Sequence, residues 1–283
     1  MPQGLSFADA DSAMSDADVI IYGVPYDRTT TFRSGSREAP NAVRRASYNF
    51  EASHFEHGRL PEARMHDFGD VDDHIYPEDM FDEIRFSMSP AVRDNKFTAA
   101  IGGEHSITAP IVELYNDVSV ISIDAHLDSR DEFMGSPHSH ACVMRRCVET
   151  VGIDNVFVLG VRSISEEEMD GDDIIPYITS YEIMENGIAK AVRRALDSVR
   201  NEKIYLTVDI DGIDPAFAPG TGTQEPFGLM PIDVKKVINE IGGRLVGMDV
   251  VEISPPYDHG GITAVLGARL IKEGVAVYYK HQR

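Results

Sequence analysis

The stretch VISIDAHLDSRDEF, residues 120–133, gives the first indication of the fold. Its opening residues are mostly apolar, as in a buried strand, and Asp124, His126 and Asp128 follow at alternate positions. If the strand continues through them, all three side chains point to one face. Two carboxylates beside an imidazole repel one another and lose hydration unless a cation lies among them. The stretch therefore predicts a buried strand that ends in half of a metal site.

Length and charge limit the class of protein. The chain has 283 residues, 42% hydrophobic and 26% charged, and we expect one domain over residues 1–283. Asp and Glu number 47 against 26 for Lys and Arg, a net charge of −21 that argues against a nucleic-acid partner and suits a small cationic molecule. With 7 Lys against 19 Arg, the composition resembles that of proteins from a high-salt cytoplasm, and an ordinary acidic protein is the alternative.

Cysteine content and hydropathy indicate the compartment. Cys142 and Cys147 are too few for a disulfide framework, and no apolar run approaches the ~20 residues of a membrane span. The N-terminal MPQGLSFADADSAMSDADVI lacks the basic and apolar regions of a signal peptide. We expect a cytoplasmic protein with no membrane partner.

Strand-like and helix-like segments alternate along the chain. Six β-rich runs are predicted as buried parallel strands, near residues 18–24, 97–103, 118–124, 155–161, 203–211 and 245–253. Helices are predicted over 39–50, 181–200 and 231–242, the last with Pro231 at its start and two glycines at its end. This alternation predicts an α/β domain with helices on both faces of a parallel sheet.

The unusual polar residues follow the strands. In an open parallel sheet, ligands bind outside the carboxyl ends of the strands. Four predicted strands deliver acids and imidazoles to that edge, namely His105, Asp124, His126, Asp128, Asp209, Asp211 and Glu252. Asp209 and Asp211 stand two apart and are expected to share a face.

The charges predict the type of site. Four carboxylates and two imidazoles are balanced by two divalent cations, which share bridging carboxylates and a water-derived ligand at ~3.5–4 Å separation. Oxygen and imidazole ligands without thiolate suit Mn²⁺ better than structural zinc, and Co²⁺, Ni²⁺ or Zn²⁺ remain alternatives. Asp214, before a proline, is interpreted as a turn former, and Glu104 as structural.

Long motifs resemble one family over nearly the whole chain. They are GVPYDRTTTFRSGSREAPNAVRRAS at 23, GGEHSIT at 102, IDAHLDSR at 123, SHACVMRR at 139, TVDIDGIDPAFAPGTGTQEPFG at 207 and GMDVVEISPPYD at 247. They resemble the ureohydrolases, which comprise arginases, agmatinases, guanidinobutyrases and formiminoglutamases, and agmatinase-like members most. The resemblance implies a three-layer α/β/α sandwich with a central parallel sheet of about eight strands, assembled as homotrimers or homohexamers.

The resemblance also implies roles for individual residues. His105, Asp124, Asp128 and Asp209 match the ligands of one manganese ion, and Asp124, His126, Asp209 and Asp211 those of the other, which gives two Mn²⁺ per subunit. His140 matches a histidine that moves protons, with His138 as its rival here, and Glu252 matches the acid that pairs with a substrate guanidinium. Asp128 is also expected to orient the attacking hydroxide.

The substrate hypothesis rests on the loop SRDEFMGSPH, residues 129–138. Asp131 and Glu132 would repel a substrate carboxylate, so the loop favours agmatine, which has a cationic end and no carboxylate. The predicted substrate-binding residues are Glu252, His140 and Asp131. Hydrolysis of agmatine to putrescine and urea is the first hypothesis. Guanidinobutyrate, aminopropylagmatine, arginine and formiminoglutamate remain alternatives.

Three other functions are weighed against this hypothesis. Cys142 lies near His140, which suggests a deiminase-like cysteine nucleophile, although a free cysteine is more often a small buried hydrophobe. A deacetylase on a related fold would use a single zinc ion, which the two-metal ligand set does not favour. A non-enzymatic relative would not need every expected ligand.

Overall fold

A computed structural model of the chain describes residues 5–59, 63–171 and 174–282. Its centre is an eight-stranded sheet in the order β4-β1-β5-β10-β9-β6-β7-β8, and every pairing is parallel. The strands are β1 Val19–Val24, β4 Met65–Asp70, β5 Phe97–Gly102, β6 Val118–Ile123, β7 Val156–Val161, β8 Tyr177–Thr179, β9 Lys203–Asp209 and β10 Leu245–Val251. A separate small hairpin pairs β2 Ser53–His54 with β3 Gly58–Arg59.

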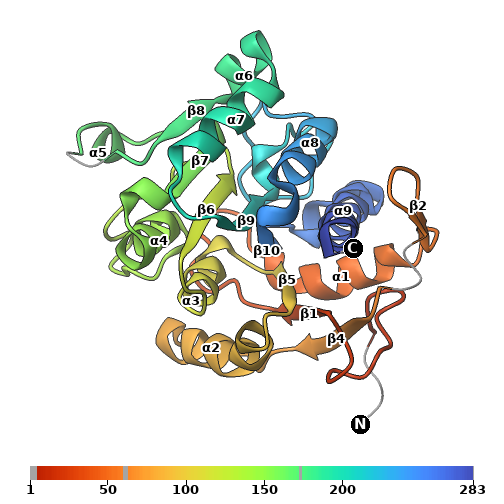
Figure 1. Cartoon of the computed structure of the whole chain (residues 1–283). Coiled ribbons are helices and arrows are strands. Elements are labelled where there is room, and N and C mark those ends of the chain that lie inside the picture. The colour runs from red at the N-terminus through yellow and green to blue at the C-terminus, as the bar shows by residue number, and fades with distance from the viewer. Residues whose placement is uncertain (1–4, 60–62, 172–173, 283) are drawn as a thin grey trace.

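Helices cover both faces of the sheet (Figure 1). One face packs on α1 Ala39–Ser47, α6 Ser180–Asn186, α7 Ile188–Ser198, α8 Pro231–Ile241 and α9 Ile262–Gln282. The other packs on α2 Pro77–Arg93, α3 Thr108–Val112 and α4 Val143–Val151, while the short α5 Glu166–Met169 contributes no buried residue. Successive strand residues alternate between the two cores, since Ile20 and Tyr22 face one and Val19 and Ile21 the other. The predicted three-layer α/β/α sandwich with eight parallel strands is confirmed.

Two sequence expectations are corrected. The helix predicted over 181–200 is divided at Gly187, whose φ of 84° ends α6 before α7 begins. The edge strands β4 and β8 lie outside the six predicted strands, because β4 reads MHDFGD and is partly exposed, and β8 has only three residues. No helix within the described ranges is long and apolar enough to cross a membrane.

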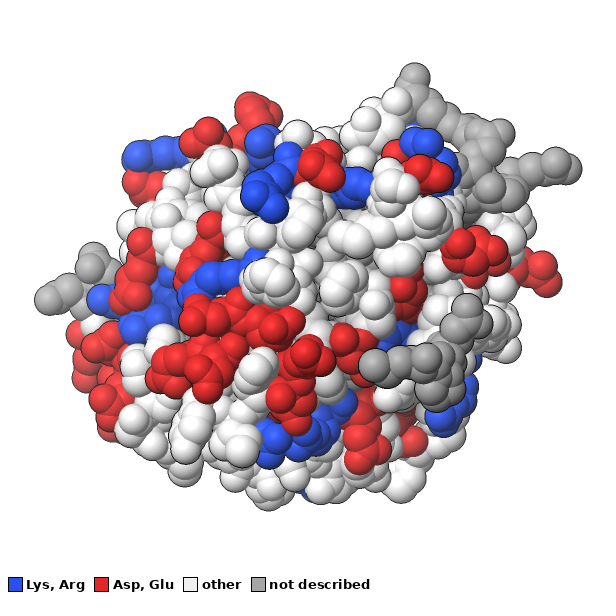
Figure 2. All heavy atoms as spheres, turned by 90° about the horizontal axis from the view of Figure 1, so that it is seen from below, with Lys and Arg blue, Asp and Glu red and all other residues white. Residues whose placement is uncertain are grey.

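The surface reflects the acidic composition. Figure 2 views the molecule from below Figure 1, on the side of α2 and β4, and Asp and Glu side chains form a broad patch on this face. Arg and Lys are interspersed, and some are paired with acids, as Arg85 is with Glu113 and Asp82.

The strand order places the site. β5, β10, β9 and β6 are consecutive neighbours at the centre of the sheet. They are the four strands whose carboxyl ends precede the predicted ligands, so these residues meet although the chain separates them by up to about 150 positions.

Candidate metal and guanidinium site

The loop after β6 does not continue the strand. β6 ends at Ile123, and the chain bends so that Asp128 adopts a φ of 47°. The expectation that Asp124, His126 and Asp128 alternate along a strand is therefore wrong. The three side chains converge because a tight loop folds them together, with the backbone N–H of His126 donating to Asp124 Oδ1 at 2.6 Å.

A first cluster surrounds His105. Its Nδ1 lies 3.2 Å from Asp124 Oδ2, 3.3 Å from Asp128 Oδ2 and 3.3 Å from Asp209 Oδ2. His105 and Asp124 are fully buried, and the other two carboxylates nearly so. The four ligand atoms lie close enough together to bind one ion.

A second cluster shares Asp124 with the first. His126 Nδ1 lies 3.2 Å from Asp211 Oδ2 and 3.6 Å from Asp124 Oδ1. β9 ends at Asp209 and Asp211 lies in the following 3₁₀ turn, so the expectation that these two share a strand face is also wrong. Instead, the Asp211 N–H donates to Asp209 Oδ1 at 2.9 Å. Gly212 permits this turn, because a Cβ there would lie 2.8 Å from the Asp124 nitrogen.

The donor set fits divalent cations. Among the residues that the structure describes, His105 Nδ1 and Asp124 Oδ2 are buried and find no hydrogen-bond partner, although they face the same small space. Burial and the charge of Asp124 raise the pKa of Asp128 to about 6, and burial with the charges of Asp211 and Asp124 raises the pKa of Asp209. Such crowding of buried carboxylates is costly unless cations neutralise them. Oxygen and imidazole donors without thiolate suit Mn²⁺ and similar ions.

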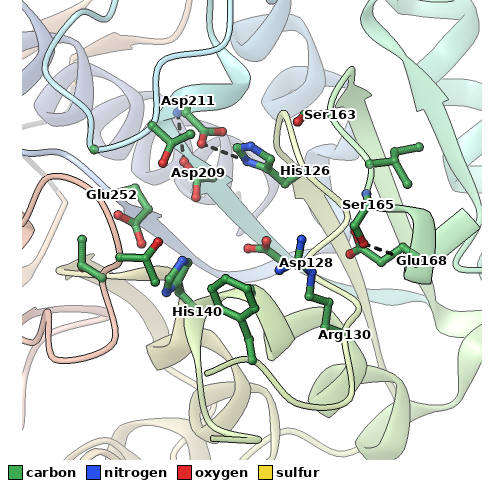
Figure 3. A pocket seen from close by; sticks show the side chains of 17 residues that line it. His126, Asp128, Arg130, His140, Ser163, Ser165, Glu168, Asp209, Asp211 and Glu252 are labelled. Atoms are coloured by element: carbon green, nitrogen blue, oxygen red, sulfur yellow. Dashed lines mark hydrogen bonds and ion pairs between the residues drawn. The ribbon is translucent and has the colours of Figure 1, made fainter. Parts of the chain in front are cut away.

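A cavity of about 330 Å³ opens above the two clusters (Figure 3). This is close to the lower size of small-molecule sites in proteins. Figure 3 shows His126, Asp128, Asp209 and Asp211 on one part of its wall, with Glu252 and His140 on another. Its charged and hydroxyl lining residues also include Arg130, Ser163, Ser165 and Glu168.

Glu252 is held in an unusual backbone conformation. It directly follows β10 with a φ of 59°, which is rare for a residue with a side chain. Its Oε1 accepts the His105 backbone N–H at 2.8 Å. Burial and the charge of Glu104 raise the pKa of Glu252 to about 8. A cationic ligand in the cavity would offset that burial cost.

His140 is fixed by a polar chain from the other side of the cavity. Its backbone N–H donates to Thr29 Oγ1 at 3.0 Å, and its Nδ1 lies 3.1 Å from the same oxygen. The Thr29 hydroxyl donates to Glu104 Oε1 at 2.7 Å. Burial and the nearby imidazoles of His105 and His126 lower the pKa of His140 to about 4, so it is neutral at pH 7.

His138 lies outside the cavity lining, beside Phe81, with its Nε2 3.8 Å from Glu78. Asp131 also lies outside it. The Asp131 side chain is 78% exposed and pairs with Arg146 at 2.7 Å. Asp131, which was expected to contact the substrate, therefore does not lie in the described wall of this cavity. Cys142 is buried, and burial raises the pKa of its thiol to about 11, which disfavours a thiolate nucleophile.

Sequence reasoning missed several residues of the site. Thr29 and Arg130 carry no metal-ligand pattern, and Glu168 lies in the ordinary acidic run SEEE. Glu225 Oε1 lies 3.5 Å from His126 Nε2, the nitrogen opposite the cluster. Glu225 lies in the motif TVDIDGIDPAFAPGTGTQEPFG, and its place in the loop after Asp209 and Asp211 is the sequence signal that points to it. Asp214 forms the turn as expected, accepting the N–H groups of Ala216 and Gly228.

Known proteins share both fold and sequence with this chain. The model of the Arginase family matches residues 17–276. Agmatinase from Bacillus subtilis is 31% identical, covering 98% of this chain and 97% of the relative. N(1)-aminopropylagmatine ureohydrolase from Synechocystis is 35% identical, covering 90% and 87%. The crystal structure of agmatine ureohydrolase from Thermoplasma volcanium superposes with a TM-score of 0.95 at 36% identity, covering 99% and 96%.

The chain therefore belongs to the arginase family. Within it, the protein is an agmatinase-like ureohydrolase, a hydrolase that acts on guanidino compounds.

Proposed function

We propose that this enzyme hydrolyses agmatine to putrescine and urea with two bound Mn²⁺ ions. The observation that carries the proposal is the pair of buried acid and imidazole clusters beneath a cavity whose wall holds Glu252 and His140. The relatives named for agmatine and for aminopropylagmatine support a guanidine with a cationic tail.

The first cluster would hold one ion through His105, Asp128 and shared aspartates, and the second would hold the other through His126 and Asp211. Two divalent ions in these clusters would lower the pKa of a bound water molecule and so supply hydroxide at neutral pH. Asp128 lies on the cavity wall, where its second oxygen can accept a hydrogen bond and orient that nucleophile.

Glu252 is proposed to bind the guanidinium. One of its oxygens is already fixed by the His105 N–H, so the other is aimed with little freedom. Fixing a planar cation in one orientation removes much of the entropy cost of attack on a carbon whose charge is delocalised.

His140 is proposed to protonate the departing amine. With a pKa of about 4 it is neutral at rest, so it first accepts a proton released at the nucleophile and then donates it. The contact with Thr29 holds the ring at the wall while it does so.

Glu168 is proposed to bind the end of the substrate that lies away from the guanidinium. Its carboxylate accepts hydrogen bonds from Ser129 and Ser165, and with burial opposed by these bonds the pKa is lowered, so the charge persists at neutral pH. An anion on the cavity wall suits the second cationic group of agmatine. Glu168 thus takes the role that sequence reasoning gave to Asp131.

One observation favours a second candidate. Arg130 also lines the cavity, with its guanidinium 4.4 Å from the centre of the Phe133 ring, and such a cation would suit a substrate carboxylate. The alternative substrate is therefore 4-guanidinobutyrate.

The test is urea release from agmatine, aminopropylagmatine, arginine and 4-guanidinobutyrate, and formamide release from formiminoglutamate, using metal-free protein reloaded with Mn²⁺. We expect selective turnover of agmatine that chelation abolishes. Glu168→Gln should raise the KM for agmatine, whereas Glu167→Gln, at the neighbouring position outside the cavity lining, should not. Preferred turnover of 4-guanidinobutyrate, with a KM raised by Arg130→Gln, would replace agmatine as the substrate.

Two sequence predictions are carried forward with this proposal. They are assembly as a homotrimer or homohexamer and a cytoplasmic location. Light scattering of the purified protein checks the first, and fractionation of source cells checks the second.

A further inference from the structure

A fully buried polar network lies directly beneath the first metal cluster. Asp249 on β10 is 0% exposed and accepts hydrogen bonds from three hydroxyls. Thr207 Oγ1 donates at 2.6 Å, and Thr108 Oγ1 and the Tyr205 hydroxyl each donate at 2.9 Å. No metal ligand in the described chain is among these direct partners, so the cluster itself does not account for a charge at this position.

The network reaches the cluster through one atom. Thr207 Oγ1 lies 3.0 Å from His105 Nε2, the ring nitrogen opposite the one that faces the aspartates. Thr207 and Asp249 are register partners on the adjacent strands β9 and β10. Two positions further along β9 is Asp209, on the same face as Thr207. The relay is therefore built into rigid sheet and not into a loop.

The direction of each hydrogen bond follows from the chemistry of the groups. An ionised carboxylate only accepts, so the Thr207 proton is committed to Asp249. The Thr207 oxygen can then accept only through a lone pair, and its partner must be the Nε2–H of His105. In the neutral ring, which is the form that binds a metal ion, a proton on Nε2 leaves Nδ1 without one and with its lone pair directed at Asp124, Asp128 and Asp209.

We propose that Asp249, acting through Thr207, is a positioning residue that fixes the tautomer and ring orientation of His105 for metal binding. The inference rests on the proposed two-metal site. Groups that orient a ligating histidine in this way typically change metal affinity by about 10- to 100-fold. Only the ion bound by His105 should respond, because His126 has its own partner in Glu225.

The experiment is titration of Mn²⁺ into metal-free protein, followed by calorimetry and by electron paramagnetic resonance of the coupled ion pair. Thr207→Val keeps the side-chain volume and removes the hydroxyl. We expect it to weaken one of two binding steps about 10- to 100-fold and to replace the coupled signal with that of a single ion. Thr207→Ser, which retains the hydroxyl, should restore both.

Tyr205→Phe is the matched control. It also removes one hydrogen bond to Asp249 but leaves the path from Asp249 through Thr207 to His105 intact, so both binding steps should match those of wild type. Two unchanged steps in Thr207→Val, or equal losses in Thr207→Val and Tyr205→Phe, would overturn the positioning role alone. Wild-type protein that binds no metal would overturn both the inference and the proposed function.

Discussion

Replacing Thr29 with valine tests whether the Thr29 hydroxyl holds His140 in position. The Thr29 hydroxyl donates to buried Glu104 at 2.7 Å and accepts the His140 N–H at 3.0 Å. Loss of a hydrogen bond to a carboxylate costs about 1.5–3 kcal/mol, and leaving the N–H unpaired costs about 1–3 kcal/mol. Valine has nearly the same volume, so no cavity term is added. The free energy of unfolding should fall by between about 2.5 and 6 kcal/mol.

Activity should fall for a different reason. Without its partner the His140 ring moves, and misplacement of an acid–base group typically lowers kcat by about 100-fold. The KM for agmatine should stay constant, because Thr29 is not part of the cavity lining. Steady-state kinetics, manganese content and urea unfolding provide the three measurements.

A matched control keeps the loss of stability apart from the loss of activity. Thr98→Val removes one buried hydroxyl contact, 2.6 Å from Tyr115 near the amino end of β5, far from the cavity lining. It should lower stability and leave kcat unchanged. Wild-type kcat in Thr29→Val would refute the role of the chain from Glu104 to His140, and lost manganese would show that the variant acts on the metals instead.

Three further outcomes follow from the structure. Arg44→Met removes a buried guanidinium paired with Asp67 at 2.8 Å and with Asp70, and calorimetric or chemical unfolding should show a loss of about 3–5 kcal/mol with manganese content unchanged. If free metal is first present at 100 times the Kd of a site, chelation should lower the free energy of unfolding by about 3 kcal/mol for that site. An unchanged Tm would contradict metal binding. Burial raises the pKa of Glu104 from 4.5 to about 7, so in metal-free protein the folded state binds this proton more tightly than the unfolded state. This adds about 3 kcal/mol to the free energy of unfolding below pH 4.5, and the gain is lost as pH rises through 7. In Glu104→Gln, the plot of unfolding free energy against pH should be flatter over that window.

Sequence patterns predicted the sheet and the residues that cluster at its carboxyl edge for one physical reason. Buried parallel strands must be apolar on both faces, so an acid or imidazole just beyond such a run stands out, as Asp124 does after β6 and Asp209 at the end of β9. The local geometry was beyond the same reasoning. Side chains alternate with a period of two only in a strand. Asp128 instead has a left-handed backbone conformation, and Asp211 lies in a 3₁₀ turn.

The part of the cavity wall proposed to bind the far end of the substrate shows why the remaining residues could not be predicted. Asp131 is predicted because its charge, in the loop between IDAHLDSR and SHACVMRR, would repel a substrate carboxylate, but its side chain turns outward to Arg146. Glu168 reaches the cavity from beyond β7, held by Ser129 and by its own capping box with Ser165. Nothing in the run SEEE distinguishes Glu168 from the other two glutamates, because what distinguishes it is that the fold brings it close to Ser129.

The strand order also links metal binding to global folding. His105 and Asp124 lie within 20 positions of each other, yet their strands β5 and β6 are separated in the sheet by β10 and β9. The first cluster needs Asp209 from β9. Glu252 is positioned only when β10 lies beside β5, because the Glu252 backbone N–H then donates to the Gly103 carbonyl oxygen. A chain that lacks its last third therefore has acids and imidazoles but no site. Metal bound at these clusters would therefore stabilise the whole sheet, because the residues that would hold it come from both of its halves.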